Sequence, residues 1–511
     1  MRGFSSNLAG LLLLAGAVGH TAPAGDSAAC RPCHQAIVDA YAKTGMGRSI
    51  TASPVLPEAT FYHRLSNRHY TAGGGKIRRH QRGADGQEIQ VAEKAADFGI
   101  GSGNHAVTFV HRTPKGLLIE LPLSWYRERN GYAMSPGYDA PDHPDMRREI
   151  SNACLFCHAA YPRGESEKPA SIDCERCHGD TRAHLARPQR GTALHPGKLP
   201  ADRQLAICLQ CHLQTASQGI VDSVLRPGRG AFSFRPGEAL GDFKTLFDRA
   251  DSPGPRFEVN HAGYRLLQSA CFQKSGGAMT CTTCHDPHTA KARNACGGCH
   301  ESKHAKNAEA DCAGCHMPKR RPSDAIHVTM TDHWIQRRPQ FQNPEREAQS
   351  RYTGPVVPFY GEADPLQLAI ANIRELTSEV PALYQEYLRR TPDDAAALAA
   401  LGNALARLGR AAEAIPVLER ALQVERTHVG ALNTLAVTRA ARGEYRAAIV
   451  LLERAREAHP DHSLTWANLG VTYRAMGQRT EAIAAFREAI RLQPDLGEAR
   501  QRLAEALAEG R

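Results

Sequence analysis

The pattern of apolar and polar positions divides the chain into three regions, and the first has the strict alternation of antiparallel strands. It predicts two hairpins, over residues 76–92 and 106–121. Their turns fall at residues 83–86 and 113–116, and both turns contain glycine, which favours a tight reversal. We therefore expect a small antiparallel β insertion at about residues 56–125.

The second region, between residues 154 and 316, has few long apolar periods and many glycines and prolines. Such a stretch cannot build a conventional core of large apolar side chains. We expect short helices joined by loops. Residues 336–363, which are rich in proline, indicate a linker to the third region.

The third region, residues 364–511, repeats with a period of 34. Small residues recur at this interval, which lets paired helices pack closely. The recurring positions are Gly409, Gly443 and Gly477, then Ala414, Ala448 and Ala482. The last full unit carries the complete tetratricopeptide (TPR) pattern, with Trp466, Leu469, Gly470, Tyr473, Ala482, Phe486, Ala489 and Pro494.

About three full TPR repeats are expected, flanked by a partial helical pair and a capping helix. The concave face of such a solenoid usually binds a protein. The alternatives are self-association through this domain or a purely structural stalk.

An apolar run near the N-terminus, from Leu8 to Gly19, indicates an export signal. It has 12 residues, too few to cross a bilayer, and it lies between Arg2 and the small residues at 22–24. We expect a cleaved signal peptide at residues 1–24, a periplasmic protein and no integral membrane span. A lipoprotein anchor at Cys30 is the alternative.

The chain contains 15 cysteines, and 14 of them form C-x-x-C-H motifs. The seven motifs are Cys30, Cys33 and His34; Cys154, Cys157 and His158; Cys174, Cys177 and His178; Cys208, Cys211 and His212; Cys281, Cys284 and His285; Cys296, Cys299 and His300; and Cys312, Cys315 and His316. A scrambled chain of this composition would contain on the order of 0.02 such motifs, so the pattern is not accidental.

This spacing is the signature of covalent haem attachment. Two thiols one helical turn apart reach the two vinyl groups of a porphyrin, and the adjacent histidine meets the iron from the same side. Zinc ribbons and disulfides also use paired cysteines, but neither requires histidine directly after every second cysteine. We therefore expect seven covalent c-type haems, with the motif histidines as proximal iron ligands.

The second axial ligands must come from other histidines. His288 follows His285 by three residues and lies near the same helical face, so it cannot reach the opposite side of that porphyrin. We expect it to bind the iron of a neighbouring haem; a hydrogen bond to a haem propionate is the alternative.

Other histidines are candidate distal ligands as well. His184 and His261 are favoured, whereas for His105, His304, His327 and His333 a propionate or backbone partner is equally expected. Met46 is a weaker candidate ligand. Cys271 is the one cysteine outside the motifs, and we expect burial rather than reactivity or iron binding.

The formal net charge of +10 would ordinarily indicate an anionic partner. Haem propionates would offset much of that charge. The sequence has no nucleic-acid-binding motif and no run of basic residues interleaved with aromatic ones, so we expect no nucleic-acid partner.

The chain resembles the TPR-containing multihaem c-type cytochromes of bacteria. Its haem half is similar to the tetrahaem cytochrome of nitrifiers and to the octahaem hydroxylamine-oxidoreductase group. The likeness rests on GSGNHAVTFVHR, LPLSWY, CFQKSGGAMTCTTCHDPH, DAIHVTMTDHWIQRRP and the repeats. It implies periplasmic electron transfer with redox partner proteins, closely stacked haems, and a distal role for His288.

Two departures limit the resemblance. No C-x-x-C-K motif is present, although ammonia-forming nitrite reductases commonly carry one, and the motif count is seven rather than eight. The enzymatic roles of those groups therefore do not transfer.

The sequence predicts a mainly α-helical protein in two parts. A seven-haem cytochrome domain at residues 25–335, built of short helices and loops with the β insertion, precedes a TPR solenoid at 364–511. We interpret it as an electron carrier. The alternative is an oxidoreductase in which one haem keeps an open site for a small nitrogen or sulfur compound.

Overall fold

The computed structural model of the chain describes residues 27–509. The exceptions are residues 84, 115, 142, 164–167, 216–219, 252–255, 290, 294, 299–311, 326, 338–353, 375 and 494–495. The expected signal peptide, Cys299, His300 and His304 lie outside the described residues. Within the described residues, no helix combines the length and the apolar character needed to cross a membrane.

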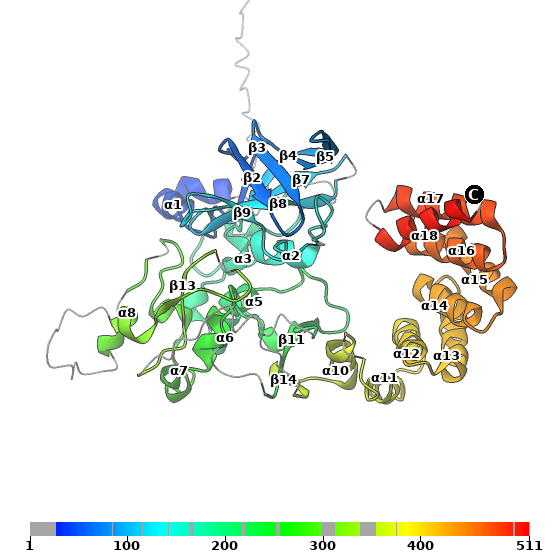
Figure 1. Ribbon diagram of the computed structural model, residues 1–511. Coiled ribbons are helices and arrows are strands. Elements are labelled where there is room, and N and C mark those ends of the chain that lie inside the picture. The colour runs from blue at the N-terminus through cyan, green and yellow to red at the C-terminus, as the bar shows by residue number, and fades with distance from the viewer. Residues whose placement is uncertain are drawn as a thin grey trace, which may run out of the picture.

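Two antiparallel sheets dominate the N-terminal part (Figure 1). One has the order β2-β3-β4-β5, and its strands are Ala59–His63, Arg68–Gly73, Lys76–Arg82 and Glu88–Ala95. The other has the order β1-β6-β7-β8-β9, with strands Ile50–Ala52, Phe98–Ile100, Ala106–Arg112, Leu118–Tyr126 and Gly131–Met134. The pairs β4–β5 and β7–β8 confirm both predicted hairpins.

A shared core joins these sheets. Tyr70 and Ile77 from the four-stranded sheet pack in one buried cluster with Phe109, Leu121 and Tyr132 from the five-stranded sheet. Alternate residues along β3, Tyr70 and Ala72, are buried in this core, as expected for a strand with one face turned inward.

The β structure is more extensive than predicted. Strands begin at Ile50 and end at Met134, beyond the expected insertion at 56–125. Two further sheets lie in the second half of the expected haem domain. Their orders are β10-β11-β14 (Ser223–Leu225, Lys244–Arg249, Val356–Tyr360) and β12-β13 (Lys319–Arg320, Met330–Thr331). Strands β10, β12 and β13 have only two or three residues each, too few for an alternating pattern to be recognised, and β14 pairs with a strand more than 100 residues before it.

Strand β14 falls inside the segment assigned to the linker. It pairs antiparallel with β11, whose six residues are all buried. The end of the proline-rich segment is thus a structural strand of the N-terminal half.

Each C-x-x-C-H motif within the described residues lies on or beside a short helix, as predicted. These helices are α1 (Ser27–Tyr41), α2 (Asn152–His158), α3 (Glu175–His178), α5 (Ala201–His212), η3 (Cys281–Thr283), η4 (Cys296–Gly298) and α8 (Cys312–His316). The remaining helices of this half are α4 (Arg182–Ala186), η1 (Pro196–Lys198), η2 (Leu240–Asp242), α6 (Ala262–Leu267) and α7 (Ala270–Lys274).

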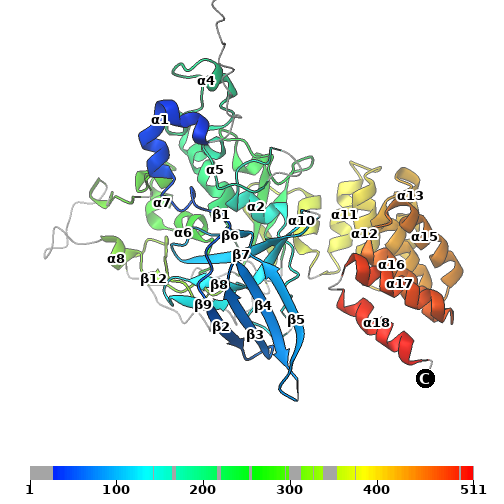
Figure 2. The ribbon, with the colours of Figure 1, turned by 90° about the horizontal axis from the view of Figure 1, so that it is seen from above.

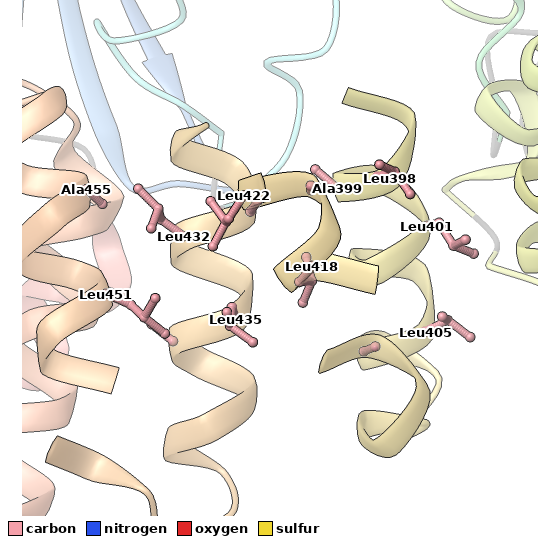
Figure 3. Close-up of a cluster of buried hydrophobic side chains, with 14 of the residues drawn as sticks. Leu398, Ala399, Leu401, Leu405, Leu418, Leu422, Leu432, Leu435, Leu451 and Ala455 are labelled. Carbon is pink, nitrogen blue, oxygen red and sulfur yellow. The ribbon is translucent and has the colours of Figure 1, made fainter. Parts of the chain in front are cut away.

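The C-terminal half is a row of helical hairpins (Figures 1 and 2). Its helices are α10 (Pro365–Asn372), α11 (Val380–Leu388), α12 (Ala395–Arg407), α13 (Ala411–Val424), α14 (Val429–Ala440), α15 (Tyr445–Ala458), α16 (Ser463–Ala475), α17 (Arg479–Leu492) and α18 (Gly497–Ala508). Leucines from α12 to α15 meet in a continuous buried cluster (Figure 3).

Glycine at the repeat period has a structural reason. The first helix of each successive hairpin ends at a glycine with positive φ: 75° at Gly409, 82° at Gly443 and 76° at Gly477. Residues with a side chain are strained in this left-handed conformation, whereas glycine adopts it readily. Gly470 in α16 sits against the Phe486 ring, and a Cβ there would lie 2.6 Å from it. The repeated glycines therefore have two causes: some allow the turn between helices, and Gly470 allows two helices to pack closely.

The two halves are joined by packing as well as by the chain. Helix α10 contacts β10 and β14, and Ala371 shares a buried cluster with Phe247 and Val356. The buried Gln367 accepts hydrogen bonds from Arg226 at 3.0 Å and Thr245 at 3.3 Å through its Oε1. The first helix of the C-terminal half is thus anchored to the sheet β10-β11-β14.

A buried polar cluster lies between β3 and the segment that follows β9. His143 is 3% exposed, and its Nε2 lies 2.9 Å from Arg68 and 3.2 Å from the Tyr70 hydroxyl. Its Nδ1 accepts from the Asp145 backbone N–H at 3.1 Å, and the His63 ring is 5.5 Å away. Burial, followed by the Arg68 guanidinium, lowers the pKa of His143 to about 4.

This cluster predicts an acid-sensitive fold. An unfolded histidine has a pKa of about 6.5, so between about pH 6.5 and 4 the unfolded chain binds a proton that folded His143 does not. The stabilisation is complete above pH 6.5 and is lost as the pH falls toward 4. We expect the Tm of the wild type to fall more steeply over this range than that of His143→Gln, measured by calorimetry. Parallel curves for the two proteins would contradict this assignment.

Candidate functional site

Five pairs of histidine rings lie close together in the described N-terminal half. Two of them, His63–His143 and His69–His80, contain no motif histidine and have ring centres 5.5 and 5.1 Å apart. The other three pairs lie around the motifs. His34 and His184 have ring centres 6.3 Å apart, His178 and His288 6.0 Å, and His285 and His333 6.1 Å. The angles between the ring planes are 26°, 21° and 32°. In each of these three pairs, one histidine belongs to a C-x-x-C-H motif and the other does not.

The spacing of these pairs matches two ligands of one metal ion. A metal–imidazole bond is about 2.0–2.1 Å long, so two rings that bind one ion from opposite sides have centres roughly 6 Å apart. Haem iron bound by two histidines requires this arrangement. The pairs therefore fit axial ligation.

Hydrogen bonds orient several of these rings. The Nδ1 of His178 lies 3.0 Å from the Leu194 carbonyl, that of His333 3.1 Å from the Thr331 carbonyl, and that of His184 2.8 Å from the Thr192 hydroxyl. Each of these acceptors holds the Nδ1–H and leaves Nε2 for a metal. His316 is oriented in the same way, with Nδ1 2.7 Å from the Gln336 carbonyl.

Desolvation favours the neutral form that metals bind in two of these rings. It is the largest cause that lowers the pKa of His178 and of His333. Desolvation by the surrounding protein also lowers the pKa of His158 and of His212, although both residues are exposed to solvent. His212 lies near His158, His285 and His333, so motif histidines from three helices gather in one region.

The pairs connect different motifs. His288 follows the motif of His285 in sequence but faces His178. His184 follows the motif of His178 and faces His34. A histidine from the segment after one motif thus faces the motif histidine of another.

Cysteines of different motifs are also in contact. The four pairs are Cys30 with Cys174, Cys157 with Cys211, Cys208 with Cys281, and Cys296 with Cys312. In the second pair, the hydrogen bond with Cys211 and burial raise the pKa of Cys157. Together with the histidine pairs, these contacts link the first five motifs into one connected series.

Two buried cations lie beside the second and fourth motifs. Arg176 is 2% exposed and stacks on Phe156 at 4.4 Å, and its Nη1 has no hydrogen-bond partner. Lys244 is 8% exposed and donates to the Gln210 carbonyl at 2.9 Å. Within the described part of the chain, neither forms an ion pair with a carboxylate. Buried charge without a counter-ion is costly, and haem propionates would supply one.

The donor sets, their spacing and these uncompensated cations fit covalently attached haem. Cysteine pairs would hold the porphyrin, and the motif histidines with His184, His288 and His333 would hold the iron. Among the described residues, no group of three or more His, Cys, Asp or Glu side chains is arranged to bind a metal ion by itself.

The structure does not pair the other predicted ligands. Both ring nitrogens of His261 are engaged, because Nδ1 accepts from the Glu258 N–H at 3.1 Å and Nε2 lies 2.7 Å from the Thr215 carbonyl. This geometry argues against the predicted distal role. His327 accepts from Arg129 at 3.0 Å, and His105 is exposed with no ring partner in the described regions.

The two sulfur candidates are placed differently from each other. Met46 is half-buried, next to a turn. Cys271 is also half-buried rather than fully buried as expected, and it lies close enough to Cys296 to raise the pKa of that thiol.

A buried ionic triad supports His333, and sequence reasoning missed it. Arg265 in α6 binds Asp332 through two hydrogen bonds of 2.9 and 2.8 Å, and Arg320 in β12 adds a third at 2.8 Å. Burial acts to raise the pKa of Asp332, but the two guanidinium groups hold it below its usual value. The triad fixes the backbone that carries His333.

Comparison with known proteins concerns the helical half. The model of the middle TPR-like domain of cilia and flagella-associated protein 70 matches residues 370–493. A search of curated proteins finds no match.

Solved structures with similarity include MamA from Desulfovibrio magneticus RS-1, at 23% identity over 29% of this chain and 86% of that one, with a TM-score of 0.26. YrrB, a TPR protein with an unusual peptide-binding site, has 24% identity over 26% and 72%, with a TM-score of 0.24. The first TPR of Spaghetti, bound to an HSP90 peptide, has 17% identity over 22% and 91%, with a TM-score of 0.22. The family match and the helical hairpins make residues 370–493 a TPR-like helical domain.

The triad generates a stability prediction. Asp332→Ala removes the carboxylate that two buried guanidinium groups share, so we expect a loss of about 3–5 kcal/mol in the free energy of unfolding. Urea denaturation measures it. The control is Asp39→Ala, which removes an exposed ion pair with Arg31 and should cost less than about 1 kcal/mol. Equal effects of the two variants would contradict a structural role for the triad.

Proposed function

We propose that this chain is an exported, periplasmic multihaem c-type cytochrome that carries electrons through seven covalently bound haems. The fourteen motif cysteines would attach the haems, and the motif histidines would be the proximal ligands. When bound, haem iron supplies one-electron oxidation and reduction.

The single observation that carries this proposal is the set of three opposed histidine pairs. Each joins a motif histidine to a histidine far from it in sequence, at the separation that an axially bound iron requires. Disulfide or zinc use of the same cysteines gives no reason for these pairs. The connected series of motifs supports transfer between neighbouring sites over short distances.

The TPR domain supports a second part of the function. TPR domains bind peptide or protein partners, and α10 anchors this domain to the N-terminal half. We propose that it docks a protein partner, so that the cytochrome half is held close to a redox protein. Self-association through the same surface is the competing use.

A second candidate function is an oxidoreductase with one open haem site. Among the described residues, no second histidine ring pairs with His212 or with His158, whose side chain is exposed. A haem at His158 would have room for a small nitrogen or sulfur compound. Arg176 and Lys244 nearby would favour an anionic one.

Electron paramagnetic resonance on the oxidised protein separates these candidates. An electron carrier should show low-spin signals that account for its haems. A stoichiometric high-spin signal that shifts with nitrite or hydroxylamine would favour the enzyme and contradict a purely conducting role.

A histidine variant tests the assigned ligands. His288→Ala removes the partner of His178, so we expect one haem to change from low spin to high spin while the others stay unchanged. His105→Ala, at an exposed position, is the matched control and should leave the spectrum as it is. An unchanged spectrum in the first variant would refute the His178–His288 assignment.

A further inference from the structure

The segment around α4 carries an unusual concentration of positive charge. Between residues 181 and 200 there are four cationic side chains and no acidic one. Arg182 pairs with the neighbouring Asp180. The other three, Arg187, Arg190 and Lys198, make no ion pair within the described part of the chain, and all three are exposed or partly exposed.

This charge lies at the end of the connected series of sites. His184 in α4 faces His34 in α1, and the first motif contacts only the third motif through Cys30 and Cys174. Figure 2 shows α1 and α4 at an edge of the molecule away from the TPR helices. Both Cys33 and His34 are exposed, so the first site is accessible from solvent.

Exposed apolar side chains accompany the cations. Ile37, three residues after His34, is 46% exposed, and Leu185, next to His184, is 37% exposed. A small apolar centre with a charged rim is the composition of a transient protein interface. The rim sets partner choice and the rate of encounter through its charge.

We propose that α1 and the segment 181–200 form a docking surface for an acidic electron-transfer protein, which exchanges electrons at the site of His34 and His184. The inference rests on the proposed function, since it names the partner of the first haem. It gives the chain two partner surfaces, one basic and next to a redox site, the other on the TPR domain. Charge complementarity selects the occupant, because nothing in the segment offsets Arg187, Arg190 and Lys198.

The alternative role of these cations is to interact with the protein's own haem rather than with a partner protein. Arginines near a haem can neutralise its propionates, and in that case their removal would change the midpoint potential of the first haem. A docking role instead predicts changes in affinity and encounter rate that depend on ionic strength.

The test uses the purified holoprotein, its Arg187→Glu/Arg190→Glu variant, and flavodoxin as an acidic one-electron probe. The matched control is Arg64→Glu/Arg82→Glu, which makes the same charge change on the four-stranded sheet. Calorimetric titration gives Kd at low and high ionic strength, stopped-flow mixing gives the reduction rate, and redox titration gives the potentials.

At low ionic strength, we expect the 187/190 variant to bind flavodoxin about tenfold more weakly and to be reduced more slowly, with the difference vanishing near 0.5 M salt. The control variant should behave like the wild type, and dithionite should reduce all three proteins alike. An unchanged Kd, or a shifted potential without a change in Kd, would overturn the docking surface. Haem content is measured separately. A chain without haem would refute the proposed function, and this result is distinct from a failure of the docking surface alone.

Discussion

We propose that the arrangement of the N-terminal half depends on one geometric constraint: two imidazole rings that bind one iron must have their centres roughly 6 Å apart. The ring centres of His178 and His288 are 6.0 Å apart, although 110 residues separate the two histidines in the chain. The Leu194 carbonyl fixes the tautomer of His178 from behind. The loops around α3, α4 and η3 therefore have to be placed precisely even though they contain little regular structure.

This constraint explains why the two halves are stabilised so differently. The TPR helices bury a continuous cluster of leucine and alanine that the repeats supply themselves (Figure 3). Around the motifs, the expectation that no conventional apolar core forms is wrong, because Phe156, Leu209, Phe234 and other large apolar side chains make a buried cluster. Cysteines of the motifs pack against this cluster, and buried cations such as Arg176 lack a carboxylate partner within the described residues. A cofactor with apolar faces and anionic edges would complete such a region. The sheet β10-β11-β14 and α10 connect it to a domain that needs no cofactor.

Local sequence signals predicted the local structure well. The hairpins β4–β5 and β7–β8, the helices that carry the motifs, and the TPR period all follow from patterns within a few tens of residues. Strand β14 escaped prediction because its partner β11 lies more than 100 residues away and proline dominates its surroundings. The other strands that were not predicted, such as β9, β12 and β13, have partners close in the sequence but only two to four residues each.

Sequence spacing bears only on the proposed covalent part of the site. The C-x-x-C-H spacing predicts the attachment residues, but which histidine faces which depends on tertiary structure. His184 and His288 could be favoured from their positions after motifs, whereas His333 could not be separated from His327. His261 was favoured as a distal ligand on the same kind of sequence argument, yet its ring is hydrogen-bonded to the Thr215 carbonyl and the Glu258 N–H. Neither these backbone partners nor the Arg265–Asp332–Arg320 triad can be predicted from a single sequence, because each joins residues that are brought together only by the tertiary structure.

The most direct measurement is the intact mass of the purified, exported chain, obtained under denaturing conditions that remove everything not covalently bound. If the seven motifs hold haem, the mass exceeds that of the mature polypeptide by seven haem groups, and each attached peptide carries two thioether bonds. A chain at its bare polypeptide mass, with its cysteines free or joined as disulfides, would contradict the proposed cytochrome.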